Sequence, residues 1–103
     1  MKVFLDDLRS PPDEGWVLVR TAKEALDLLS ASGVLEVSLD NDLGDGQAEG
    51  CTVANWIERR ASTDPAFRIP VVRVHSANPA ARVRMTVTIG RIEAEARRRG
   101  ERG

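Results

Sequence analysis

The chain has 103 residues, with 15 basic and 16 acidic side chains, and 42% of its residues are hydrophobic. This length fits a single domain over residues 1–103, and the near-zero net charge excludes a strongly basic nucleic-acid binder. The hydrophobic content excludes a disordered acidic chain, and no apolar run reaches the ~18 residues of a membrane span. One cysteine and one histidine can form neither an internal disulfide nor a Cys/His zinc site. A bound metal would therefore need oxygen ligands.

The N-terminal segment lacks the pattern of a signal peptide. Its apolar run at residues 3–5 stops at Asp6 and Asp7, and this acidic pair would interrupt the hydrophobic region that a signal peptide needs. We therefore expect a cytoplasmic protein with no strong signal for nucleic acid or membrane. The sequence carries no signal for a particular oligomeric state.

The first half of the chain predicts three strands and one helix. Short apolar runs indicate strands at residues 3–5, 16–19 and 35–39. Thr21 and Glu24 have the spacing of a capping box, so a helix should begin there and end at Gly33.

The connection between the first two predicted strands is unusual. Residues 8–15 contain two prolines and are too few for a helical crossover between parallel strands. The strand at residues 16–19 is therefore either an edge strand reached by an irregular loop or antiparallel to its neighbour.

The second half predicts a helix over about residues 50–61, a strand at 69–75 and a long last helix. Asn78 followed by Pro79 is a typical helix start. The arginine-rich tail, about residues 97–103, is expected to fray in solvent. Strands that alternate with helices predict an α/β fold with a mostly parallel sheet.

Residues 43–50 contain three glycines and lie between a strand and a helix. Such a segment is either a substrate lid or a simple connection. Asp45 and Glu49 are weak candidates for site residues for the same reason.

Polar residues follow three of the predicted strands at the point where each strand ends. Asp6 and Asp7 follow the first strand, Asp40 and Asp42 the third, and the run from His75 the last. Ligands of open α/β sheets bind beyond the carboxyl ends of the strands, so we expect these residues to converge.

Aspartates brought close together repel one another, and a divalent cation would remove that repulsion. Oxygen ligands suit Mg²⁺ or Mn²⁺. We therefore expect Asp6, Asp7 and Asp40 to be metal ligands, with Asp42 or the Asn41 carbonyl as a further ligand. The alternative is that these aspartates cap helices and mark turns.

Four further residues complete the predicted site. His75 is suited to acid or base catalysis near neutral pH, with a backbone-bonded strand-end histidine as the alternative. Ser76 can donate to a phosphate oxygen, and Asn78 opens a helix whose N-terminus favours an anion; both also suit simple capping. Arg9 could reach back over the site to a phosphate or balance the acidic pair.

This pattern resembles a response-regulator receiver domain. The resemblance implies that Asp6 and Asp7 hold Mg²⁺, that Asp40 is the central carboxylate and that Ser76 contacts the phosphoryl group. It also implies a receiver-like (flavodoxin-like) three-layer sandwich, here abbreviated. The usual first helix and fifth strand are missing from the sequence pattern, and no lysine follows Lys23 to pair with the central carboxylate.

Three motifs are closer to a small family, the cyclic-phosphate processing receiver domains. They are VFLDDLR at residues 3–9, SLDNDLG at 38–44 and VHSANP at 74–79. The resemblance implies action on cyclic-phosphate-containing molecules. At the position of Asn41 the family often carries a histidine.

We therefore expect metal-dependent binding and hydrolysis of a cyclic-phosphate-containing small molecule or nucleotide, with Asp40 and His75 as the catalytic residues. One alternative is a signalling receiver that accepts a phosphoryl group on Asp40. The other is a module that binds a phosphorylated ligand without catalysis.

Overall fold

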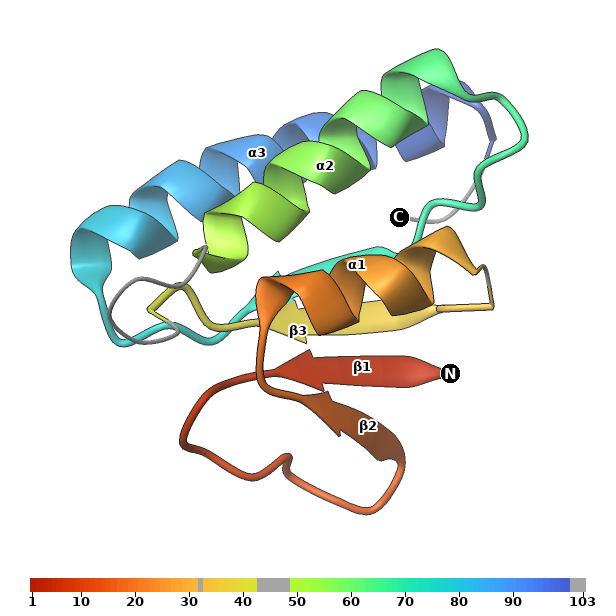
Figure 1. Ribbon diagram of the computed structural model, residues 1–103. Helices are drawn as coiled ribbons and strands as arrows, with labels where there is room; N and C mark the ends of the chain where they lie inside the picture. The colour runs from red at the N-terminus through yellow and green to blue at the C-terminus, as the bar shows by residue number, and fades with distance from the viewer. Residues whose placement is uncertain (32, 43–48, 101–103) are drawn as a thin grey trace.

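The computed structural model describes residues 1–31, 33–42 and 49–100. Four strands and three helices follow one another along this part of the chain (Figure 1). They are β1 (Lys2–Leu5), β2 (Trp16–Val19), α1 (Ala22–Ser30), β3 (Glu36–Leu39), α2 (Gly50–Thr63), β4 (Val71–Val74) and α3 (Pro79–Arg98).

The four strands form one parallel sheet in the order β2-β1-β3-β4. This is the flavodoxin-like strand order without its fifth strand, and the order reverses between β1 and β3. Leu5 pairs with Val19 and Leu39, and Leu39 pairs with Val74, so all four strands end at the same edge. The receiver-like α/β fold is confirmed.

Strand β2 lies at the edge of the sheet and is parallel to β1. The irregular-loop alternative for residues 8–15 is therefore confirmed, and the antiparallel alternative is wrong. No helix lies between β1 and β2, and Figure 1 shows the connection looping away from the sheet.

All three helices of the described residues lie on one face of the sheet. The crossovers β2-α1-β3 and β3-α2-β4 run in the same direction, and right-handed crossovers in one direction place their helices on one face. Helix α3 packs along α2 and against β4 (Figure 1). The described residues form no second layer of helices, because the β1–β2 connection is too short to carry a helix to the other face.

The core lies between the helices and this face of the sheet. Alternate strand residues face the helices, and Val3, Leu5, Val37 and Leu39 are fully buried. The helices contribute the buried residues Leu29, Val53, Ile57, Met85 and Ile92.

The second face of the sheet is covered by side chains. Phe4 stacks on the ring of His75 at a centroid distance of 4.3 Å and meets Trp16 edge-on at 5.9 Å. Arg73 and Glu36 form an ion pair across β4 and β3 at 2.6 Å. Aromatic stacking and cross-strand pairing thus take the place of a helix on this face.

The helix ends follow the local sequence signals. Both bonds of the Thr21–Glu24 capping box are present at the start of α1, and Gly33 adopts a φ of +90° after its end. Asn78 caps α3 by accepting from the N–H of Ala81, and Pro79 occupies the first turn.

The C-terminal end of α3 overlaps the arginine-rich tail and is tied to the end of α2. The helix extends to Arg98, and the guanidinium of Arg99 donates to the carbonyls of Phe67 at 2.8 Å and Asp64 at 2.9 Å. The tail predicted to fray, about residues 97–103, thus begins within this helix, and residues 101–103 lie outside the described part of the chain. None of the described helices is long and apolar enough to cross a membrane.

Candidate metal and phosphate site

Three carboxylates meet at the carboxyl edge of the sheet, where the strand order reverses. Asp6 and Asp7 follow β1, Asp40 follows β3, and one oxygen from each lies within 4.8 Å of the other two. Asp6 and Asp40 are buried, and Asp7 is half-buried. The expected convergence of the strand ends is thus confirmed for these three residues.

Asp6 is held by hydrogen bonds on both of its oxygens. Oδ1 accepts from the backbone N–H groups of Leu8 and Arg9, each at 2.8 Å, and Oδ2 lies 3.0 Å from Nε2 of His75. Burial alone would raise the pKa of Asp6, but these donors outweigh burial and hold the pKa below its ordinary value. Asp6 is therefore an ionised carboxylate in a fixed orientation.

Asp40 has the opposite electrostatic environment. Burial and the negative charge of Asp6 raise its pKa above the ordinary value, although the N–H of Asn41, at 2.8 Å from Oδ1, opposes this shift. The charge of Arg9 opposes it as well. Ionised Asp40 is thus under repulsion that a cation would relieve.

The donor set fits a hard divalent cation. All three groups offer carboxylate oxygens, and among the described residues Asp7 has no hydrogen-bond partner that would compete with a ligand. Asp6, Asp7 and Asp40 are therefore the residues that could hold Mg²⁺ or Mn²⁺.

Asp42 lies outside this group of three carboxylates. It is exposed, Oδ1 lies 3.2 Å from the side-chain amide of Asn41, and Oδ2 lies 3.5 Å from that of Asn78. Its predicted role as a ligand gains no support from this placement. The carbonyl of Asn41 accepts from the N–H of Gly50 at 2.9 Å, which uses one of its two lone pairs.

His75 lies beside the cluster with both ring nitrogens engaged. Nε2 faces Oδ2 of Asp6 at 3.0 Å, and Nδ1 lies 2.7 Å from the hydroxyl of Ser38. Phe4 covers one side of the ring at an interplanar angle of 7°. The imidazole is thus fixed against the Asp6 carboxylate. In the predicted acid–base role, it would have to give up one of these two hydrogen bonds to reach a substrate.

Ser76 and Asn78 are placed at the start of α3. Ser76 is buried, and its hydroxyl accepts from the N–H of Asn78 at 3.1 Å while retaining a proton to donate. Asn78 engages Ala81 through its side chain and Arg82 through its carbonyl, and Pro79 has no N–H. The helix start therefore has few free donors, and Ser76 is the better placed of the two to bind phosphate.

Two arginines border the acidic cluster. Arg9 reaches across the edge of the sheet, and its Nη1 donates to the carbonyl of His75 at 2.9 Å. Arg20 follows β2, and its Nη1 donates to the carbonyls of Asp6 at 3.2 Å and Arg9 at 3.3 Å. Sequence reasoning identified Arg9 but missed Arg20, whose position at the end of a strand was the available signal.

Asn41 links the end of β3, where Asp40 lies, to the start of α2. It is fully buried, its Oδ1 accepts from the N–H of Cys51, and its Nδ2 donates to Glu49 at 2.7 Å. The side chain thereby caps the first turn of α2, since Glu49 itself provides no capping bond. Of residues 43–50, predicted as either a substrate lid or a simple connection, residues 43–48, which include Asp45, lie outside the described part of the chain.

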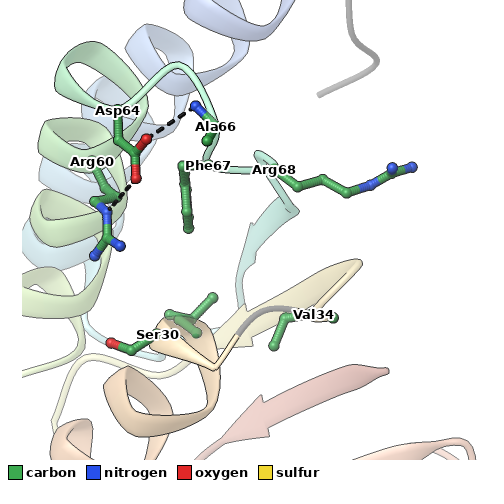
Figure 2. Close-up of a pocket in the computed structure, with 9 residues that line it drawn as sticks. Ser30, Val34, Arg60, Asp64, Ala66, Phe67 and Arg68 are labelled. Atoms are coloured by element: carbon green, nitrogen blue, oxygen red, sulfur yellow. Dashed lines mark hydrogen bonds and ion pairs between the residues drawn. The ribbon is translucent and has the colours of Figure 1, made fainter.

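A separate cavity of about 140 Å³ lies away from these carboxylates. It is lined by residues from the end of α1, the connection between α1 and β3, the end of α2 and the segment that follows α2, including Val34, Arg60, Asp64 and Phe67 (Figure 2). Arg60 points towards Asp64 in Figure 2, and its Nε lies 3.1 Å from Oδ2 of Asp64. The charge of Arg60 is therefore already paired. The acidic cluster is therefore the better candidate site.

Comparison with known families agrees with this geometry. The model of the family described as "Cyclic-phosphate processing Receiver domain" matches residues 1–91. The chain belongs to this family. The resemblance read from the three motifs is thereby confirmed, and the matched segment of this receiver domain contains every residue of the site described above. Nothing among the curated proteins or the solved structures matches it significantly.

Proposed function

We propose that this receiver domain binds Mg²⁺ or Mn²⁺ through Asp6, Asp7 and Asp40, and that it binds and hydrolyses a cyclic phosphate of a small molecule or nucleotide. The observation that carries the proposal is the convergence of three carboxylate oxygens within 4.8 Å at the switch point of the sheet. Membership of the cyclic-phosphate processing family supports the substrate class.

The surrounding residues supply contacts for a phosphate. The hydroxyl of Ser76 would donate to one phosphate oxygen, and the remaining N–H groups of Arg9 would provide positive charge above the carboxylates. A bound divalent cation would polarise a phosphate oxygen and lower the pKa of a bound water.

Opening a cyclic phosphate also requires a proton on the leaving oxygen. His75 is the only histidine in the chain, and its Nε2 lies 3.0 Å from Asp6. To protonate a leaving group, the ring would have to give up this hydrogen bond.

A binding module without turnover is the second candidate. It is favoured by the same imidazole, because both ring nitrogens already have partners in the protein. A signalling receiver that uses Asp40 as phosphoacceptor is less favoured. No lysine follows Lys23, and the described residues contain no fifth strand that could carry one to the central carboxylate.

Phosphorus NMR separates these functions. The protein is incubated with Mg²⁺ or Mn²⁺ and with 2′,3′- and 3′,5′-cyclic nucleotides, beside Asp40→Asn and the distant control Asp27→Asn. The proposal predicts a metal-dependent ring-opened product that is lost in Asp40→Asn and retained in Asp27→Asn. Saturable binding without a product would establish the binding module instead, and stable phosphorylation of Asp40 by acetyl phosphate would establish the signalling receiver.

A further inference from the structure

Ser38 is buried on the face of the sheet that carries no helix, and no predicted function includes it. In the register of the sheet, Phe4 of β1 lies beside Ser38 of β3, and Ser38 lies beside Arg73 of β4. His75 is two residues beyond Arg73 and therefore lies on the same face. This register places the imidazole of His75 against the ring of Phe4 from β1 and the hydroxyl of Ser38 from β3.

With a neutral imidazole, the hydrogen-bond chain through His75 has one consistent arrangement of protons. Oδ1 of Asp6 accepts from two backbone N–H groups, as expected for an ionised carboxylate, which has acceptors only. At 3.0 Å from Oδ2, Nε2 of the imidazole must therefore carry the proton. In the neutral ring Nδ1 is then an acceptor, so the hydroxyl of Ser38, 2.7 Å away, is the donor.

Phe4 removes most of the remaining freedom of the ring. The two rings lie 4.3 Å apart and nearly parallel, so the imidazole can rotate only within its own plane or flip over. A flip would replace each ring nitrogen by a carbon and lose both hydrogen bonds. The Ser38 bond and the Asp6 bond together thus select one orientation.

We propose that Ser38 is a positioning residue of the carboxylate site: its hydroxyl donates to Nδ1 of His75 and fixes the ring with Nε2–H directed at Oδ2 of Asp6. Among the described residues, Nε2 is the one donor to Oδ2, and a carboxylate oxygen can accept more than one contact. The consequence for cation binding rests on the proposed function, since the orientation of Asp6 sets how well it serves as a ligand.

The position of the ring proton can be measured without any metal. The chain has a single histidine, so every imidazole signal in a ¹H–¹⁵N spectrum of the full chain belongs to His75. For the neutral ring, we expect the proton on Nε2 and an Nδ1 signal typical of a hydrogen-bonded acceptor. In Ser38→Ala the Nδ1 signal should move towards that of a free acceptor. Ser38→Thr, which keeps the hydroxyl, and the distant control Ser62→Ala should retain the wild-type signal.

A Mn²⁺ titration of the same proteins tests the consequence for the carboxylates. Ser38→Ala should lower the Mn²⁺ affinity by about tenfold, the lower end of the range for side chains that orient metal ligands, and Ser38→Thr should restore it. If Ser38→Ala acted only through lost packing, Ser38→Thr would not restore the Mn²⁺ affinity. The Nδ1 signal would then also stay unchanged in Ser38→Ala.

Three results would overturn the inference about Ser38. They are a ring proton on Nδ1 in the wild type, an Nδ1 signal unchanged in Ser38→Ala, and a changed signal with unchanged Mn²⁺ affinity. If Ser38→Ala fails to fold, the wild-type spectrum and Ser38→Thr decide the question. A wild-type chain that binds no Mn²⁺ would overturn the proposed metal site, whereas the spectra would still decide whether Ser38 orients the ring.

Discussion

A Cβ atom placed on Gly50 would lie 1.8 Å from the carbonyl oxygen of Asp40. The first turn of α2 therefore passes directly against the backbone of a site residue, at a distance that only glycine allows. The N–H of Gly50 donates to the carbonyl of Asn41 at 2.9 Å and ties the helix start to the same backbone. The position of Asp40 thus depends on a glycine ten residues further along the chain.

Gly50→Ala should displace α2 from the end of β3. The added methyl group cannot be accommodated by a side-chain movement, because the atoms it would meet belong to the backbone. We expect a loss of about 1–3 kcal/mol in the free energy of unfolding and weaker Mn²⁺ binding. Urea unfolding and a Mn²⁺ titration measure both effects.

Gly90 is the matched control for this substitution. It lies within α3, and nothing is within 4 Å of a Cβ placed there. Gly90→Ala should raise the free energy of unfolding by about 1 kcal/mol through helix propensity and leave Mn²⁺ binding unchanged. Equal effects of the two substitutions would contradict the close approach at Gly50.

Asp40→Asn should stabilise the metal-free protein while weakening its cation site. Burial and the charge of Asp6 raise the pKa of Asp40, so the ionised group is a source of repulsion in the folded state. The amide removes that charge and keeps an oxygen to accept from the N–H of Asn41. A gain of about 1 kcal/mol would raise the melting temperature by roughly 4–8 °C.

Asp27→Asn is the control for the removal of an acidic charge. Asp27 is exposed and paired with Lys23 on α1, where such pairs contribute little. We expect a small change in melting temperature. A lower melting temperature for Asp40→Asn than for Asp27→Asn would show that no repulsion acts at Asp40.

Asp6 should make stability depend on pH. Its pKa is lowered in the folded protein, so its stabilising contribution is complete above the ordinary pKa of aspartate and is lost as the pH falls through the folded pKa. To isolate this titration, Asp40→Asn is compared with Asp6→Asn/Asp40→Asn by urea unfolding from about pH 6 down to about pH 2. The gap in free energy should shrink as the pH falls, and a constant or widening gap would contradict the lowered pKa.

Asn41→Ala should destabilise the fold although it removes no charge. The side chain is fully buried and bonds both Cys51 and Glu49 at the start of α2. Removing it leaves the half-buried N–H of Cys51 without its acceptor and a cavity at a fully buried position, and we expect a loss of about 1–3 kcal/mol. Asn55→Ala is the control, because Asn55 is exposed on α2 and its side-chain oxygen makes only a long contact, 3.4 Å, with the hydroxyl of Thr88. A loss as large at Asn55 would contradict the capping role of Asn41.

Much of the site could be predicted because parallel strands end at one edge. Asp6, Asp7 and Asp40 each follow a short apolar run, so their convergence needed only the assignment of the strands and their direction. The helix caps at Thr21 and Asn78 could also be predicted from the sequence, because the two residues that form each cap are only three positions apart.

The remaining features depend on register and on backbone distances, which local patterns do not contain. Ser38 meets His75 only because of how β1, β3 and β4 are aligned. Gly50 lies against Asp40 only because α2 folds back over the end of β3. The helices lie on one face because the two crossovers run in the same direction, which requires the order of the strands.

The most direct test of the metal site is a Mn²⁺ titration by calorimetry of the wild type, Asp7→Asn and Asp27→Asn. Asp7 is the most informative ligand to change, because among the described residues its carboxylate makes no hydrogen bond that the fold would lose. The cluster of Asp6, Asp7 and Asp40 predicts a single Mn²⁺ ion per chain, bound at least about tenfold more weakly by Asp7→Asn and equally well by Asp27→Asn. Equal affinity of the wild type and Asp7→Asn, or no binding to the wild type, would contradict a cation site at these three carboxylates.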